Sequence, residues 1–270
     1  MSPKIGVFDS GFGGLTVLRA LLDRLPRAQY SFLGDSARLP YGSKSRRTIA
    51  RFACESAQFL VNHQGAQFLV IACNPASALA LDAIQAAVPV PVLGVIEPGA
   101  QAARSATKTG DVLVIATAAT VESHAYAAAC KAQGLRALEK ACPLLVPLVE
   151  EGWTDHPVTA EVIRIYLAEL LADANAQELN PDTLVLGCTH YPLLRPLFEA
   201  AVPAGMKVID SAEAAAETAV RLFSPQPEPD GEPLPAVQCF ATDSVEKFER
   251  LGSRFLRYPV GSVQLVDLGG

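Results

Sequence analysis

Two cysteines stand at positions where a thiol could act on a bound ligand. Cys73 ends the apolar run "VIAC" (70–73) and Cys188 ends the run "VLGC" (185–188), and hydrogen-bonding residues and a helix start follow each of them. The N-terminus of a helix favours the thiolate form of cysteine. One such cysteine would indicate a nucleophile, whereas two equivalent ones indicate an acid and a base that act on one substrate.

Cysteine is more often a small buried hydrophobic residue than a reactive group. Cys54, Cys130 and Cys142 fit that simpler interpretation, because they lie within or beside apolar segments. The six cysteines show no CxxC spacing, and the four histidines lie far apart in the sequence. We therefore expect no zinc or other metal site, and free thiols in place of disulfides.

Other polar residues follow the expected strands, at the edge where open α/β sheets bind ligands. His190, two residues after Cys188, is interpreted as a partner that shifts the ionisation of that thiol, with a purely structural histidine as the alternative. Asp9 opens the turn "DSGFGG", whose glycines let backbone N–H groups approach an anion. Alone this turn is weak evidence, because it lacks GxGxxG spacing and a Walker lysine. The same edge is expected to carry Ser10, Gly11, Asp35, Ser36, Asn74, Glu97 and Thr189.

Strands and helices are expected to alternate along the chain. Because several expected strands are apolar throughout, their sheets should be covered on both faces, which is typical of parallel α/β folds. Strands are expected at 4–9, 29–35, 66–73, 90–97, 111–117, 183–189, 206–210 and 237–243. Helices are expected at 13–25, 45–63, 77–88, 123–133, 158–173, 193–201, 212–223 and 245–256.

The sequence also shows signs of an internal duplication. Cys73 and Cys188 are separated by nearly the same number of residues as Glu97 and Asp210, and both pairs follow similar strands. Two similar α/β halves would explain this agreement, and chance similarity among buried strands is the alternative. The Pro-rich acidic segment "SPQPEPDGEPLP" (224–235) is typical of an exposed connector.

Composition limits the possible classes of protein. The 270 residues, half of them apolar, suffice for one large domain or two of ordinary size. The net charge of −6 argues against nucleic acid as a partner, and the basic run at 43–51 is interpreted as a solvated helix face. No apolar run reaches the roughly 20 residues of a membrane span. With no signal peptide recognised, we expect a cytoplasmic protein.

Five stretches, taken together, resemble the glutamate racemase family: "GVFDSGFGGLTVL" (6–18), "GDSARLPYGSKS" (34–45), "VIACNPASA" (70–78), "VPLVEEG" (146–152) and "VLGCTHYPLL" (185–194). The resemblance implies a cofactor-independent enzyme that interconverts L- and D-glutamate and supplies D-glutamate for peptidoglycan synthesis. It implies two pseudo-symmetric α/β domains with the active site in the cleft between them. The implied division is 1–97 plus 208–270 for the first domain and 98–207 for the second.

The resemblance also implies roles for individual residues. Cys73 and Cys188 would be the two acid/base thiols, one on each face of the substrate. Asp9 and His190 would assist them, together with a second-domain carboxylate, Glu150, for which the neighbouring Glu151 is the alternative. The implied substrate-binding positions are Asp9, Ser10, Tyr41, Gly42, Asn74, Pro75, Thr189 and His190.

One residue departs from the family pattern: Pro75 stands where the family usually has threonine. Proline has neither a hydroxyl nor a backbone N–H, and each lost bond to a charged group could weaken binding by roughly 1.5–3 kcal/mol. A related racemase acting on aspartate is therefore one alternative. A two-lobed protein that binds a small anion is a second, and a hydrolase using Cys188 and His190 is a third. The sequence does not define the oligomeric state, and it leaves a homodimer open.

Overall fold

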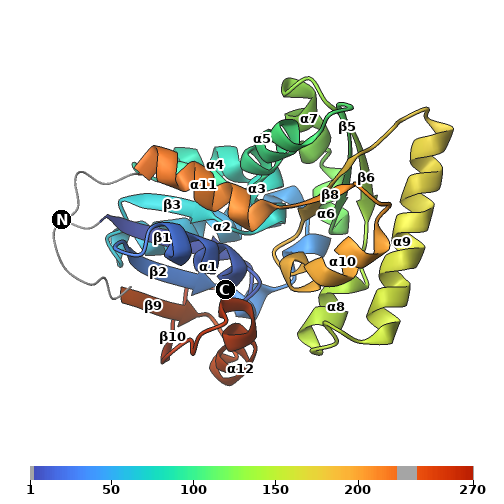
Figure 1. Cartoon of the computed structure of the whole chain (residues 1–270). Coiled ribbons are helices and arrows are strands. Elements are labelled where there is room, and N and C mark those ends of the chain that lie inside the picture. The colour runs from blue at the N-terminus through green and yellow to red at the C-terminus, as the bar shows by residue number, and fades with distance from the viewer. Residues whose placement is uncertain (1–2, 224–235, 270) are drawn as a thin grey trace.

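A computed structural model describes residues 3–223 and 236–269 of the chain. The acidic connector expected at 224–235 lies outside the described residues. The described residues form two sheets flanked by helices, side by side in Figure 1. Each strand pair within these sheets is parallel. The predicted α/β class with mostly parallel sheets is thus confirmed.

The first sheet contains strands from both ends of the described chain. Its strand order is β10-β9-β2-β1-β3-β4. The strands are β1 (Lys4–Asp9), β2 (Gln29–Gly34), β3 (Phe68–Ile71), β4 (Val92–Gly94), β9 (Ala236–Ala241) and β10 (Val263–Leu265).

The second sheet repeats the central part of the first. Its order is β6-β5-β7-β8, which matches β2-β1-β3-β4 when each strand is counted within its own half. In both halves the third strand in sequence, β3 or β7, is followed by a cysteine at its carboxyl end. The duplication expected from the sequence is therefore present as two halves with the same topology. The strands are β5 (Asp111–Ala116), β6 (Arg136–Ala141), β7 (Thr183–Gly187) and β8 (Lys207–Asp210).

Helices cover both faces of each sheet, as the apolar strands require. Val7 of β1 packs in one buried cluster with residues of α1, α11 and α12, and the next residue, Phe8, packs in another with residues of α2. The cluster that contains Val7 continues to Leu186 of β7, so one core joins the two halves. The longer helices are α1 (Leu15–Arg24), α2 (Arg46–Asn62), α5 (Ile96–Ala106), α7 (Ala125–Ala132), α9 (Pro157–Ala176), α11 (Ser211–Phe223) and α12 (Val245–Leu256). The shorter ones are α3 (Asn74–Leu79), α4 (Leu81–Ala87), α6 (Ala118–Glu122), α8 (Leu145–Glu150) and α10 (Arg195–Ala201).

Some expected elements differ in the structure. The helix expected at 77–88 begins earlier, at Asn74, and divides at Ala80, whose φ of −136° is not helical. The strand expected at 90–97 ends at Gly94, and α5 starts two residues later. Glu97 therefore lies exposed in the first turn of α5, and the prediction that it sits at a strand end was wrong.

We propose that the chain divides into two domains that follow the two sheets, close to the division expected from the resemblance. Its boundaries fall inside α5 and inside β8, the two elements where the chain passes between the halves. Since β8 pairs with β7 through Asp210, the second domain is best extended to that residue.

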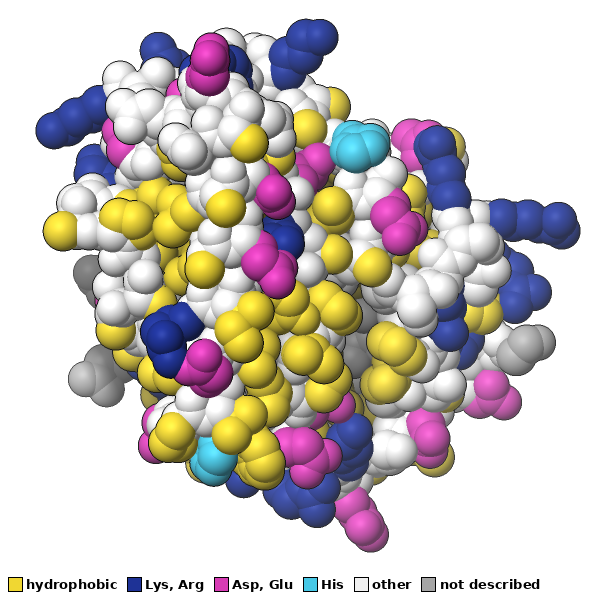
Figure 2. Space-filling view, turned by 90° about the vertical axis from the view of Figure 1, so that its right-hand side faces the viewer, with side chains coloured by type: hydrophobic (Ala, Val, Ile, Leu, Met, Phe, Trp, Pro, Cys, Tyr) yellow, Lys and Arg dark blue, Asp and Glu magenta, His cyan; other side chains and the backbone are white. Residues whose placement is uncertain are grey.

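Figure 2 shows the face on the side of the second sheet. Lys and Arg side chains are interspersed there with Asp and Glu, and hydrophobic side chains gather in its lower half. Large exposed hydrophobic residues of the segment 144–165 are Leu144, Trp153, Val158 and Ile165. Among the described residues, no helix combines the length and the hydropathy needed to cross a membrane.

Candidate active site

Cys73 lies two residues after the end of β3 and serves as the N-cap residue of α3. It is only 2% exposed, and its Sγ donates a hydrogen bond to the Ser10 hydroxyl at 3.4 Å. Ser77 fastens the start of α3 to the sheet: its hydroxyl donates to the carbonyl of Ile71 at 2.8 Å and accepts from the N–H of Val95 at 3.2 Å. Cys73 is therefore held at the carboxyl edge of the first sheet.

Cys188 occupies the equivalent place after β7, and it is 4% exposed. Its Sγ lies 3.9 Å from Nδ1 of His190. Thr189, between them, has its hydroxyl 3.4 Å from the same ring nitrogen. A thiol and an imidazole thus meet at the carboxyl edge of the second sheet, as the sequence predicted.

The turn between β1 and α1 contacts both cysteine-bearing segments. On one side Ser10 accepts the hydrogen bond of Cys73. On the other side the Thr16 hydroxyl donates to the carbonyl of Thr189 at 2.9 Å. A Cβ added at Gly13 would lie 2.4 Å from Oγ1 of Thr189 and 2.5 Å from Nδ1 of His190, so only glycine fits there. One turn therefore contacts both halves of the predicted site.

Cys73 and Asp9 are both affected by burial. Burial, together with the nearby Asp9 carboxylate, raises the pKa of Cys73 to about 12, although the hydroxyl of Ser10 acts in the opposite direction. Burial also raises the pKa of Asp9, against the charge of His190 and the N–H of Gly11, which donates to Oδ2 at 2.9 Å. At neutral pH Cys73 is therefore a protonated thiol.

In contrast to Cys73, whose neutral form is favoured, His190 has surroundings that favour its charged form. Burial opposes its charge, but its contacts with Cys188 and Glu150 raise the pKa of His190 to about 10. Its Nε2 lies 3.3 Å from Oε1 of Glu150, and Oε2 of Glu150 lies 3.2 Å from Nζ of Lys247 on α12. Burial disfavours the Glu150 carboxylate, yet His190 and Lys247 hold its pKa below the usual range. Glu150, and not the exposed Glu151, is the carboxylate at this cluster.

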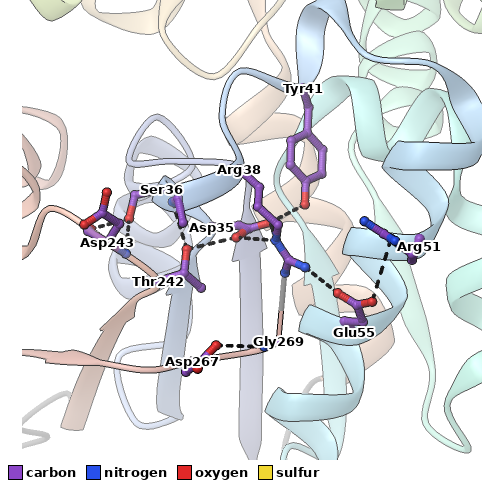
Figure 3. Close-up of polar contacts among 11 residues, drawn as sticks. Asp35, Ser36, Arg38, Tyr41, Arg51, Glu55, Thr242, Asp243, Asp267 and Gly269 are labelled. Atoms are coloured by element: carbon purple, nitrogen blue, oxygen red, sulfur yellow. Dashed lines mark hydrogen bonds and ion pairs between the residues drawn. The ribbon is translucent and has the colours of Figure 1, made fainter.

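Tyr41 and Gly42 form a short 3₁₀ turn that a buried polar network holds in place (Figure 3). The Tyr41 hydroxyl donates to the Asp35 carboxylate, which also accepts from Nε of Arg38 at 2.8 Å and from the hydroxyl of Thr242 at 2.9 Å. Asp35 was expected to face a ligand. In the structure its carboxylate instead holds the Tyr41 side chain in place.

The same turn faces the second half of the molecule. A Cβ at Gly42 would come within 3.2 Å of Cβ of Thr117, the residue after β5. Oγ1 of Thr117 in turn lies 3.2 Å from Oγ1 of Thr120. Two hydroxyls of the second half therefore lie beside the predicted substrate-binding turn.

Asn74 and Pro75 form the first turn of α3. The Asn74 side chain accepts a hydrogen bond at Oδ1 from the Tyr126 hydroxyl at 2.9 Å, while its Nδ2 is buried without a partner. Pro75 fits this position, because the first N–H groups of a helix have no intrahelical acceptor. Proline thus leaves the helix intact and removes a donor that a ligand could have used.

The structure brings most, but not all, of the predicted residues together. Glu97 is exposed, and Asp210 is engaged with the N–H of Ala212 at 2.7 Å. The sequence interpretation missed Thr117, Tyr126 and Lys247. Thr117 is the last residue of the strand expected at 111–117 and could have been found by that position, whereas nothing in the local sequence marks the other two. Within the described residues no three or more His, Cys, Asp or Glu side chains are grouped to hold a metal ion.

Two sheets of like topology, each followed by a cysteine whose segment contacts the same turn, define an α/β protein built of two similar halves. A sequence profile described as Asp/Glu/Hydantoin racemase matches residues 5–219. A glutamate racemase of Koribacter versatilis is 51% identical, over 99% of this chain and 98% of its own, and one of Syntrophus aciditrophicus is 45% identical, over 98% and 96%. The chain belongs to the Asp/Glu/Hydantoin racemase family, and within it to the glutamate racemases.

Solved structures agree with this assignment. A glutamate racemase isoform from Bacillus anthracis superimposes with a TM-score of 0.85 at 35% identity, covering 98% of both chains. A glutamate racemase from Francisella tularensis in complex with D-glutamate also gives 0.85, at 33% identity, over 99% of this chain and 98% of its own. An aspartate racemase from Picrophilus torridus gives 0.57 at 17% identity, a likeness of fold alone.

Replacing Gly13 by alanine should damage both stability and activity. The added Cβ would overlap the side chains of Thr189 and His190, and relieving such overpacking typically costs about 1–3 kcal/mol. Urea denaturation and a turnover assay measure the two effects. Gly11→Ala is the matched control for stability, since its Cβ would meet Leu39 at 3.5 Å and Asp9 at 4.0 Å, both ordinary van der Waals contacts. A Gly13→Ala protein as stable as the wild type would contradict the close approach.

The contribution of His190 to stability should depend on pH. Because the folded-state pKa of about 10 exceeds the ordinary 6.5, this contribution is complete below pH 6.5 and is lost as the pH rises through 10. The difference in free energy of unfolding between wild type and His190→Gln should therefore shrink over that interval, by at most about 1.4 kcal/mol per pH unit. Urea denaturation at several pH values measures it, and a constant difference would refute the assignment.

Proposed function

We propose that the protein interconverts L- and D-glutamate without a cofactor, by proton transfer to and from two cysteines. The observation that carries this proposal is that one turn, between β1 and α1, contacts the segments of both Cys73 and Cys188, which follow equivalent strands of two like halves. Relatives at 42–51% identity named glutamate racemase, and a structural neighbour that binds D-glutamate, support glutamate as the substrate.

In this mechanism one thiolate removes the α-proton from one face of the substrate, and the opposite thiol supplies a proton to the other face. The electrostatics fit Cys73 as the donor, because burial keeps it protonated. Cys188 is the acceptor, because the His190 imidazolium lies 3.9 Å from its sulfur and would stabilise negative charge there. Turnover in the other direction requires the two thiols to exchange roles, as catalysis of a reversible reaction between mirror images demands.

The remaining predicted residues would hold the substrate while its α-carbon loses a proton. The developing charge needs fixed donors in a site that excludes water. Since both thiols are almost fully buried, glutamate can reach them only if the two halves separate and then close again. The substrate-binding residues in this proposal are Asp9, Ser10, Tyr41, Gly42, Asn74, Pro75, Thr189 and His190.

Aspartate, or a related acid, is the second candidate substrate. The observation that favours it is Pro75, which removes one hydroxyl and one N–H from the first turn of α3. The proposed cellular role is to supply D-glutamate for peptidoglycan in the cytoplasm, and it holds only if glutamate is the substrate.

Purified protein incubated with L-glutamate, without added cofactor, should racemise it. Circular dichroism of the amino acid follows the loss of optical activity directly. L-Aspartate under the same conditions should turn over at least about tenfold more slowly, a difference of about 1.4 kcal/mol in transition-state stabilisation. Faster turnover of aspartate would reassign the substrate, and no turnover of either acid would reject the enzyme in favour of an anion-binding protein.

Cys73→Ser and Cys188→Ser should each abolish net racemisation in both directions, because a hydroxyl is a much weaker acid than a thiol and is not ionised to act as a base near neutral pH. Exchange of the α-proton with deuterated solvent should persist partly, on the face of the thiol that remains. Cys239→Ser is the control, since Cys239 is also buried but lies within β9, paired with Phe32 of β2, and not after a strand end. A single-cysteine variant that still racemises fully would defeat the two-thiol mechanism.

A further inference from the structure

Tyr126 connects the two cysteine-bearing segments, although it belongs to neither. It lies on α7 of the second half, is fully buried, and donates its hydroxyl proton to Oδ1 of Asn74. Asn74 directly follows Cys73. The Tyr126 ring packs against Gly187, which directly precedes Cys188: a Cβ there would lie 2.8 Å from Cε2 of the ring. A single side chain thus spans from one catalytic segment to the other.

The ring of Tyr126 is held in a fixed position. In addition to Gly187, Gly99 of α5 lies against it, where a Cβ would come within 3.1 Å of Cε1. Burial raises the pKa of the Tyr126 phenol far above its usual value, so the hydroxyl stays protonated and remains a donor. The hydrogen bond that it donates to Oδ1 holds the oxygen end of the Asn74 amide toward the ring.

Because Tyr126 engages Oδ1, the Nδ2 group of the Asn74 amide is left to bind another partner. Nδ2 of Asn74 is buried and has no hydrogen-bond partner in the described structure. A buried donor without an acceptor destabilises a protein by about 1–3 kcal/mol, so such groups call for an explanation. A carboxylate oxygen of the substrate would satisfy this N–H at the residue adjoining Cys73. Because Pro75 supplies no donor there, the Asn74 amide must do more of the binding.

We propose that Tyr126 is a positioning residue, which orients the Asn74 amide so that Nδ2 donates to a substrate carboxylate. The proposal rests on the proposed function, since it takes an amino-acid carboxylate as the ligand. Because the bond joins α7 of one half to α3 of the other, Asn74 is correctly oriented only when the halves are together. Binding of the carboxylate is thereby coupled to closure.

The test is Tyr126→Phe, which removes the hydroxyl and keeps the ring. The freed amide can then rotate, so KM for L-glutamate and for D-glutamate should both rise about fivefold to tenfold, with a smaller change in kcat. Calorimetric titration with glutamate should show the same loss of affinity. Tyr30→Phe is the matched control: Tyr30 is also buried and its hydroxyl also makes hydrogen bonds, to the carbonyls of Leu21 and Leu25. It should lower stability and leave KM unchanged.

Two further variants separate positioning from a structural role. In an Asn74→Ala background, Tyr126→Phe should produce no additional rise in KM, because the hydroxyl acts only through the amide. Asn74→Asp still accepts from Tyr126 but presents a second acceptor where Nδ2 was. Its KM should therefore exceed that of Asn74→Ala.

The results that would overturn the proposal are distinct from those that would reject the function. Wild-type turnover of glutamate decides the function, and it is measured first. If the wild type binds glutamate without turning it over, the titrations still decide the role of Tyr126. An unchanged KM and affinity in Tyr126→Phe, additive effects with Asn74→Ala, or tighter binding by Asn74→Asp would each refute the positioning role.

Discussion

The close approach between the turn after β1 and the segment after β7 is the contact on which the site depends. Gly13 has no side chain, and the Thr189 and His190 side chains occupy the space that a Cβ would need. Through this contact the first half reaches Cys188, while Ser10 of the same turn reaches Cys73. Without it, the two cysteines would remain at the edges of two separate sheets. The continuous core between the halves supports the contact but could not position a proton-transfer group by itself.

The two halves have the same strand order, but their thiols lie in different electrostatic surroundings. Cys73 lies near a carboxylate, Asp9, and burial further favours its neutral form. Cys188 lies near an imidazole whose protonated form Glu150 supports, and Lys247 supports Glu150 in turn. Asymmetry of this kind suits a reaction in which one group must give a proton while the other takes one. Duplication of the fold supplies two equivalent positions, and the local charges beside them differ: a carboxylate beside Cys73 and an imidazole beside Cys188.

Much of this arrangement could be predicted from sequence, because parallel strands place their carboxyl ends along one edge. The positions of Cys73, Cys188 and His190 follow from that rule and from the apolar runs before them. Asp35 was expected to contact the ligand, but it supports Tyr41 instead. This could not be foreseen, because it depends on hydrogen bonds with residues far away in the sequence, such as Thr242. Tyr126 and Lys247 were missed for the same reason: each lies on a helix whose own pattern indicates only packing or solvent exposure. Glu97 was misplaced because α5 begins soon after a strand of only three residues.

In a two-thiol mechanism, one sulfur atom takes the proton from one face of the substrate and the other sulfur atom gives a proton to the opposite face. Racemisation of L-glutamate in deuterated water, followed by mass spectrometry at low conversion, tests this most directly. Two opposed thiols predict that newly formed D-glutamate carries deuterium at its α-carbon, while unreacted L-glutamate still carries hydrogen. Product that retains the original hydrogen would show one group acting on both faces, and would contradict the paired-thiol site.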